Sequence, residues 1–304
     1  MTRPTLSIGL ANYGSTYASG EWHRFVDLGR AAEDAGVDRI ILVDHVVMGT
    51  HTEKYVWGKF PVPPDAPWFE PLTMLAAIAA VTERLRLATG ILIAPLRPAA
   101  FLAKQAATLD QLSGGRLDLG VGAGWQREEY EASGFEFDQR GQLLTDTIAA
   151  CTVLWRDTPA SFESTTLSFE NIYCEPKPRQ SGGVPLWIAG TLHRRNVERV
   201  VRYGRGWIPI MGETVDGIAD GVKRLREEFV AAGREPSELQ VQAPLRMSLG
   251  DDGPDLARSM ESVPELVAAG ATDIQVTLRA FCRDVADAPN VMKAIAERFA
   301  EATR

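Results

Sequence analysis

The sequence predicts an α/β protein that folds as a single (β/α)8 TIM barrel over residues 1–304. Strand-like and helix-like segments alternate eight times along the chain, and segments such as residues 38–44 (DRIILVD) have a continuous apolar core. Such apolar runs are typical of strands buried on both faces of a parallel sheet. An open doubly wound sheet of this length would usually show fewer units and a glycine fingerprint in its first turn. The alternation therefore favours one closed barrel.

The expected strands and helices follow one another in pairs. The strands are expected at residues 5–11, 38–44, 85–93, 116–121, 185–190, 206–210, 240–247 and 273–278. Their helices are expected at residues 21–35, 71–82, 99–112, 140–155, 194–203, 215–232, 256–269 and 285–300. In the first helix, apolar residues recur at helical spacing until Gly36 ends it.

Two insertions interrupt this order, one after strand 2 and one before strand 5. Residues 46–70 follow the C-terminal end of strand 2, where barrel active sites lie, and they contain Tyr55, Trp57, Phe60, Trp68 and Phe69. We expect this insertion to be either a lid that walls a pocket or a packed surface loop. Residues 159–183 contain two alternating stretches, which predict a small hairpin that covers the side of the barrel.

Composition narrows the function classes. The net charge of −8 and the lack of an obvious basic patch argue against nucleic acid and favour a small-molecule substrate. The three cysteines have no CxxC or Cys/His spacing, so we expect no metal site and a reducing cytoplasm. No apolar run approaches the roughly 18 residues that span a bilayer, and the N-terminus does not read as a secretion signal.

His45 ends the second predicted strand, in the sequence Val43-Asp44-His45. Side chains at the C-terminal end of a barrel strand face the ligand, so His45 is the best single candidate for proton transfer or cofactor contact. The alternative is that His45 only hydrogen-bonds a neighbouring loop while Asp44 caps a turn.

Glycines interrupt the third and fourth predicted strands. Gly90 lies inside the strand pattern 85–93, which often marks a bulge or a close approach to the backbone, and a flat ring could lie there. Residues 119–125 (LGVGAGW) hold three glycines that we expect to clear side chains from the barrel mouth. Their spacing is not the dinucleotide fingerprint.

Strand 5 ends at Ala189-Gly190-Thr191, and residues 192–195 (LHRR) open the next helix. Free amides at a helix N-terminus, a hydroxyl and nearby positive charge make a plausible phosphate cradle. The alternative is an ordinary threonine N-cap with solvated arginines.

Four segments, in this order, resemble the luciferase-like monooxygenase superfamily, and especially its coenzyme F420-dependent branch. They are residues 39–45 (RIILVDH), 83–134, 169–178 (FENIYCEPKP) and 185–209. The resemblance covers most of residues 5–210, and residues 83–134 are its most specific part. It implies a TIM barrel, usually a homodimer, that holds FMN or the deazaflavin F420 across its mouth. Hydride transfer or oxygen activation would then be the chemistry of the cofactor.

The resemblance also implies which residues form the site. His45 corresponds to the family's strand 2 histidine near the deazaflavin ring, and a cis peptide bond between Gly90 and Ile91 would form a bulge behind that ring. The implied cofactor-binding residues are Gly90, Ile91, Ala123, Gly124, Trp125, Gly190, Thr191, Leu192 and His193. The last four of these would hold the cofactor phosphate.

The sequence departs from the deazaflavin branch at two positions. Sugar-phosphate and alcohol dehydrogenases of that branch have a glutamate where this chain has Trp125 and a tryptophan where it has Gly49. Both groups belong to a proton-handling apparatus, so the departures argue against a close copy of either activity. The substrate and the direction of electron flow stay open.

Three functions are consistent with these residues. The first is a coenzyme F420-dependent oxidoreductase that transfers a hydride between the deazaflavin and a small organic substrate, because LGVGAGW resembles that branch most. The second is an FMN-dependent monooxygenase that uses oxygen and receives reduced flavin from a separate reductase. The third is a non-catalytic flavin- or deazaflavin-binding protein.

Overall fold

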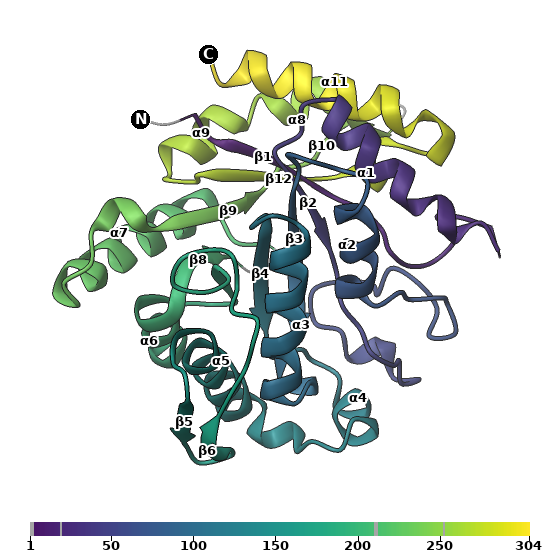
Figure 1. The fold of residues 1–304 in the computed structure, drawn as a ribbon. Coiled ribbons are helices and arrows are strands. Elements are labelled where there is room, and N and C mark those ends of the chain that lie inside the picture. Colours follow the sequence, from purple (N-terminus) through teal and green to yellow (C-terminus); the bar gives the residue numbers. More distant parts are fainter. Residues whose placement is uncertain (1–2, 19, 210–211, 252) are drawn as a thin grey trace.

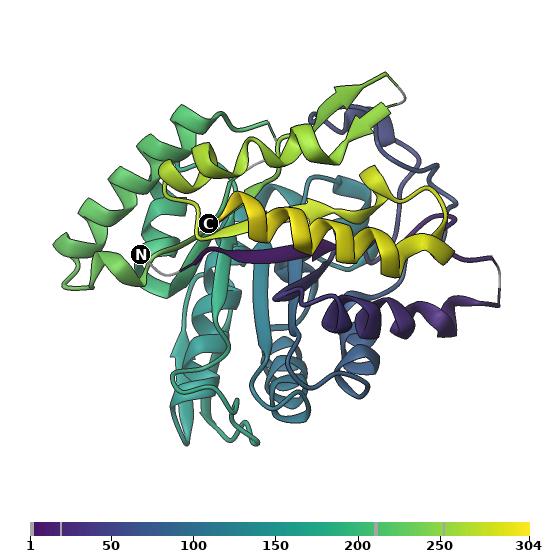
Figure 2. The ribbon, with the colours of Figure 1, turned by 90° about the horizontal axis from the view of Figure 1, so that it is seen from above.

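A computed structural model describes residues 3–18, 20–209, 212–251 and 253–304. Eight parallel strands close into a barrel in the order β1-β12-β9-β8-β7-β4-β3-β2, which confirms the predicted (β/α)8 barrel. Helices surround it, and α1 lies beside α11, so that the first and last helices complete the outer ring (Figures 1 and 2). The barrel strands are β1 Thr5–Gly9, β2 Arg39–Leu42, β3 Arg86–Ile93, β4 Leu117–Gly122, β7 Leu186–Ala189, β8 Gly204–Ile208, β9 Gln240–Pro244 and β12 Asp273–Thr277.

The helices agree closely with the sequence pattern. They are α1 Phe25–Asp34, α2 Pro71–Ala79, α3 Ala99–Leu112, α4 Arg127–Ala132, α5 Arg140–Arg156, α6 Arg194–Tyr203, α7 Val215–Ala231, α8 Leu256–Met260, α9 Val263–Ala268, α10 Leu278–Phe281 and α11 Ala288–Ala302. The strands β2 and β4 are buried at every residue because helices cover them. This burial produces the apolar runs from which the alternation of strands and helices was predicted.

The structure differs from the predicted elements in three places. The helix expected at 256–269 is two helices, because Pro264 in the first turn of α9 cannot continue the helix before it. The short helix α4 and the hairpin of β10 (Ser248–Gly250) with β11 (Gly253–Asp255) were not predicted. The strand expected at 206–210 begins earlier, at Gly204, and Ile210 lies outside the described residues.

The hairpin predicted before strand 5 is present. Strand β5 (Ala160–Glu163) pairs antiparallel with β6 (Ser168–Ile172), and β5 packs against α5 (Figure 1). This hairpin lies on the outside of the barrel, so it covers the side as expected.

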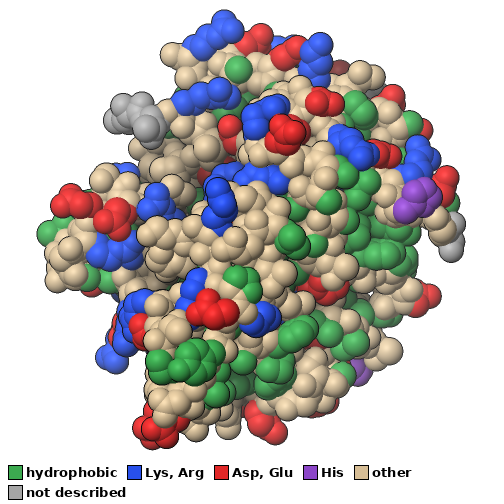
Figure 3. Space-filling model, viewed as in Figure 1, with side chains coloured by type: hydrophobic (Ala, Val, Ile, Leu, Met, Phe, Trp, Pro, Cys, Tyr) green, Lys and Arg blue, Asp and Glu red, His purple; other side chains and the backbone are tan. Residues whose placement is uncertain are grey.

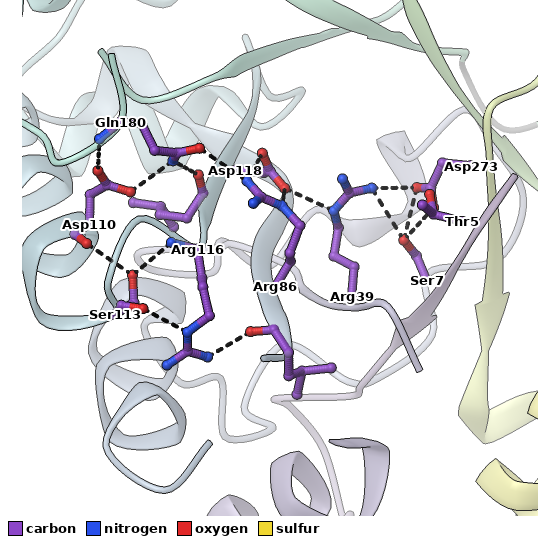
Figure 4. Close-up of polar contacts among 12 residues, drawn as sticks. Thr5, Ser7, Arg39, Arg86, Asp110, Ser113, Arg116, Asp118, Gln180 and Asp273 are labelled. Atoms are coloured by element: carbon purple, nitrogen blue, oxygen red, sulfur yellow. Dashed lines mark hydrogen bonds and ion pairs between the residues drawn. The ribbon is translucent and has the colours of Figure 1, made fainter. Parts of the chain in front are cut away.

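Charged side chains at the N-terminal ends of the strands form a buried network across the barrel floor (Figure 4). The Arg39 guanidinium donates to Asp118 Oδ2 at 3.0 Å and to Asp273 Oδ2 at 2.9 Å. Arg86 donates two hydrogen bonds of 2.7 Å to Asp118, and Ser7 Oγ donates to Asp273 Oδ1 at 2.6 Å. Burial alone would raise the pKa of Asp118, but the two arginines outweigh it and lower that pKa.

The molecular surface carries both signs of charge. On the face in Figure 3, Lys and Arg side chains are interspersed with Asp and Glu side chains, and hydrophobic side chains gather toward its right and lower parts. In the part of the chain that the structure describes, no helix is long and apolar enough to cross a membrane.

Candidate active site

His45 lies just beyond the C-terminal end of β2 and is 8% exposed. Its Nδ1 is 3.1 Å from Oε2 of Glu129, a fully buried carboxylate on α4. The other oxygen of Glu129 accepts a hydrogen bond of 2.6 Å from the backbone N–H of Val46. A histidine at the barrel mouth is thus held by a carboxylate from the connection after β4, two strands away in the barrel.

Aromatic side chains pack around His45. The rings of Phe60, Trp68 and Trp125 contact it edge to face, with centroid distances of 5.7, 4.7 and 6.1 Å. Tyr13, which follows β1, stacks on Trp68 at 4.3 Å. The insertion at 46–70 therefore packs over the histidine and walls the mouth, although Trp57 at its tip stays 38% exposed.

A cavity of about 170 Å³ lies beside the histidine. It is lined by His45, Val46, Val47, Met48, Pro63, Pro64, Ala66 and Trp68. Apart from His45, no lining side chain is ionisable. The exposed lining is mainly polar, so this space suits a small, uncharged molecule that can form hydrogen bonds.

Asp44 fixes the backbone on which His45 sits. Its carboxylate receives two hydrogen bonds from Arg97, at 2.7 and 3.0 Å, and one from the backbone N–H of Ile93 at 2.9 Å. Burial alone would lower the pKa of Arg97, but Asp44 and Glu70 raise it overall. Asp44 therefore ties the end of β2 to the end of β3 rather than capping a local turn.

The strand β3 has the bulge that the sequence indicated. The register between β3 and β4 shifts between Thr89 and Leu92, and the Gly90–Ile91 peptide bond is cis, as the family resemblance implied. Both residues lie within β3, in its C-terminal half, which leads to the barrel mouth.

The glycines of residues 119–125 allow β4 to pack closely against β3. A Cβ at Gly120 would lie 2.0 Å from the carbonyl oxygen of Thr89. A Cβ at Gly122 would lie 3.0 Å from Ile91, and one at Gly124 would lie 2.9 Å from Ile93. A side chain at any of the three would meet β3, and one at Gly120 would also meet Ile208 of β8 at 3.0 Å.

Trp125 and Gly49 are both accounted for by packing. Trp125 joins the aromatic cluster, with Tyr55 and Phe60 at centroid distances of 5.3 and 5.6 Å. A Cβ at Gly49 would lie 2.7 Å from the Cβ of Glu128, so α4 occupies the space that a tryptophan at this position would need. The carboxylate that contacts His45 comes from Glu129, four residues after Trp125.

Residues 189–193 form a rigid loop between β7 and α6. Asn196 donates to the carbonyls of Ala189 and Thr191 at 3.2 and 3.1 Å. Trp207 donates to the carbonyl of Gly190 at 2.8 Å, and Arg224 donates to that of Leu192 at 2.6 Å. The N–H of Gly190 donates to the carbonyl of Ile208 at 3.1 Å, so the N–H groups that this loop can offer to a ligand are those of residues 191–193. Gly190 has a φ of 117°, a conformation that favours glycine.

The charge around this loop is positive. His193 precedes α6 and makes no side-chain cap, and Thr191 and His193 are exposed. Partial burial, together with Arg199 and Arg195, lowers the pKa of His193. Exposed N–H groups at the start of a ten-residue helix, with cations beside them, fit a phosphate group. The N-cap alternative is not what the structure has, since the cap residue is His193 rather than Thr191.

Sequence reasoning missed Glu129, Gln126 and Arg97. Gln126 accepts a hydrogen bond of 2.8 Å from Gly49 N–H, so α4 clamps the segment after β2 twice. The acidic run at 128–129 directly after a strand end was the available signal, because carboxylates favour the first turn of a helix. Within the described ranges, no group of three or more His, Cys, Asp or Glu side chains could hold a metal ion.

Comparison with known proteins places this site in context. A family model described as luciferase-like monooxygenase matches residues 6–304. An uncharacterized protein of Mycobacterium tuberculosis is 31% identical over 265 residues, which are 84% of this chain and 85% of that protein. An FMNH(2)-dependent dimethylsulfone monooxygenase of Pseudomonas putida is 31% identical over 167 residues, 54% of this chain and 45% of that protein.

The fold similarity extends over the whole chain. The structure of an F420-dependent secondary alcohol dehydrogenase, in complex with an F420-acetone adduct, superposes with a TM-score of 0.78 and 16% identity. The match covers 98% of this chain and 99% of that one. At this identity the likeness concerns the fold.

Proposed function

Because this chain belongs to the luciferase-like monooxygenase family of oxidoreductases, we propose that it is a coenzyme F420-dependent oxidoreductase acting on a small organic substrate. The observation that carries the proposal is the pairing of buried His45 with Glu129 at the barrel mouth. The likeness of residues 119–125 to the deazaflavin branch favours F420 over FMN. When bound, the deazaflavin accepts or donates the hydride.

The residues of the chain divide the remaining work. His45 exchanges a proton at the reacting centre, and the aromatic rings of Phe60, Trp68 and Trp125 exclude water from it. Gly90, Ile91 and residues 123–125 would hold the cofactor ring. Residues 190–193 would hold its phosphate, through the N–H groups of residues 191–193, because the Gly190 N–H already donates to the carbonyl of Ile208. The substrate takes the cavity beside His45.

The same proposal includes a homodimer in the cytoplasm. The three cysteines are free thiols, two of them buried, as suits a reducing compartment. The homodimer is proposed because members of the family that the sequence resembles are usually homodimers.

The second candidate is an FMN-dependent monooxygenase that is supplied with reduced flavin by a separate reductase. The relative from Pseudomonas putida, which matches this chain over 167 residues and whose name states FMNH(2) dependence, favours the FMN-dependent monooxygenase. A non-catalytic binding protein is the third, and turnover with any electron acceptor would exclude it.

The deciding experiment is a fluorescence titration of the purified protein with oxidised F420 and, separately, with FMN. Saturable binding of F420 with much weaker binding of FMN supports the proposal. The reverse order supports the monooxygenase, and a reductase should then be needed for turnover.

Two variants test the assigned residues. Thr191→Glu places a negative charge at the phosphate site, and about 1–3 kcal/mol of repulsion at roughly 5 Å should weaken cofactor binding by a factor of about 5 to 150. Thr108→Glu, on an exposed position of α3, makes the same change away from the mouth and should bind normally. Equal affinity in both variants would move the phosphate elsewhere.

His45→Ala should bind the cofactor but turn over about 10² to 10⁴ times more slowly, as expected for loss of a general acid or base. An unchanged rate would make His45 structural.

A further inference from the structure

Glu129 has a geometry that fixes the direction of a hydrogen bond. It is fully buried, and each of its two carboxylate oxygens has a partner: the Val46 N–H at 2.6 Å and His45 Nδ1 at 3.1 Å. A backbone N–H is always a donor and an ionised carboxylate is always an acceptor. The contact to His45 is therefore satisfied when Nδ1 carries a proton.

We propose that Glu129 is a positioning residue that holds the proton of His45 on Nδ1 and leaves Nε2 as the nitrogen that exchanges a proton with the bound reactants. The tautomer is a property of the protein alone. Only the proton exchange at Nε2 rests on the proposed function.

The surroundings of the ring support this assignment. Trp68 and Trp125 stand nearly perpendicular to the imidazole, with interplanar angles of 89° and 84°, so they hold its plane. A second clamp, from Gln126 to the N–H of Gly49, keeps α4 against the segment after β2. The aromatic walls set the position of the ring, and Glu129 sets the position of its proton.

The substitution Glu129→Gln makes the inference testable because it reverses one hydrogen bond. The glutamine oxygen must face Val46 N–H, since that donor cannot become an acceptor. Its amide NH2 then faces His45 Nδ1 and requires Nδ1 to accept. The variant should therefore move the proton of the neutral ring from Nδ1 to Nε2, with almost no change in side-chain volume.

The measurement is the ring ¹⁵N chemical shifts of the cofactor-free protein at a pH where the imidazoles are neutral. The chain has four histidines, and His45 is the buried one, so its signals can be assigned with His45→Ala. We expect an Nδ1–H tautomer in the wild type and an Nε2–H tautomer in Glu129→Gln. Glu131→Gln, an exposed change on the same helix, should leave the wild-type spectrum.

The outcomes separate this inference from the proposed function. An Nε2–H tautomer in the wild type overturns the inference, whether or not Glu129→Gln folds, and so does the same tautomer in both proteins. If the tautomers behave as expected but neither F420 nor FMN supports turnover, the positioning role stands and the proposed function fails. With turnover, Glu129→Gln should slow it about tenfold or more, while cofactor affinity stays within about twofold.

Discussion

Replacing Arg39 with methionine should destabilise the barrel more than any single change of charge on its surface. Arg39 lies on the barrel floor between Asp118 and Asp273, at 3.0 and 2.9 Å. The side chains of the three residues are 6%, 4% and 1% exposed. Methionine keeps most of the apolar stem and removes the charge, so two buried carboxylates lose a shared cation.

The magnitude follows from this burial. Removing one partner of a buried ion pair costs about 3–5 kcal/mol, because the remaining charge stays desolvated without compensation. The guanidinium also lies 4.8 Å from the ring centroid of Trp187, a cation–π contact worth about 0.5–2 kcal/mol. Arg86 and Ser7 still donate to the carboxylates, so we expect a total loss of about 3–5 kcal/mol.

Urea denaturation followed by circular dichroism measures this loss as a shift of the midpoint at constant slope. The matched control is Arg30→Met, which breaks a pair with Asp27 of almost the same length, 2.8 Å, whose side chains are 51% and 58% exposed. That change should cost about 0–1 kcal/mol. If Arg39→Met loses no more unfolding free energy than the control, the argument that burial makes the ion pairs of Arg39 important for stability is refuted.

Three further outcomes are expected. The lowered pKa of Asp118 means that its contribution to stability is complete above its ordinary pKa near 3.8 and is lost as the pH falls through the lower folded value. In Arg86→Met the folded pKa of Asp118 should lie closer to its ordinary value, so the urea midpoint should fall by a smaller amount in acid than it does in the wild type, and identical pH profiles would contradict this. Gly120→Ala should lower stability by about 1–3 kcal/mol, because its Cβ would lie 2.0 Å from the carbonyl oxygen of Thr89, and a melting temperature equal to the wild type would show that β3 can move aside. Sulfate bound at the start of α6 should raise the lowered pKa of His193, so that sulfate binds more tightly as the pH falls; an NMR titration that sulfate leaves unchanged would speak against an anion site there.

The sequence by itself determined the barrel and the place of its key histidine. Apolar runs and helical spacing depend on local periodicity, so α3 (Ala99–Leu112) was predicted to the residue, and the hairpin at 159–183 was predicted as well. His45 could be found because the order of the elements fixes which strand ends face the mouth. Its role and those of the cofactor-binding residues remain proposals.

Only the tertiary structure decided what surrounds that histidine. Glu129 is 84 residues away from it along the chain, on a helix too short to leave a periodic pattern, and hydrogen bonds at that separation have no sequence signature. The same holds for the glycines at 120, 122 and 124, whose missing side chains make room for β3. Periodicity records which face of an element is buried, but the partner on that face depends on how the closed barrel brings distant strand ends together.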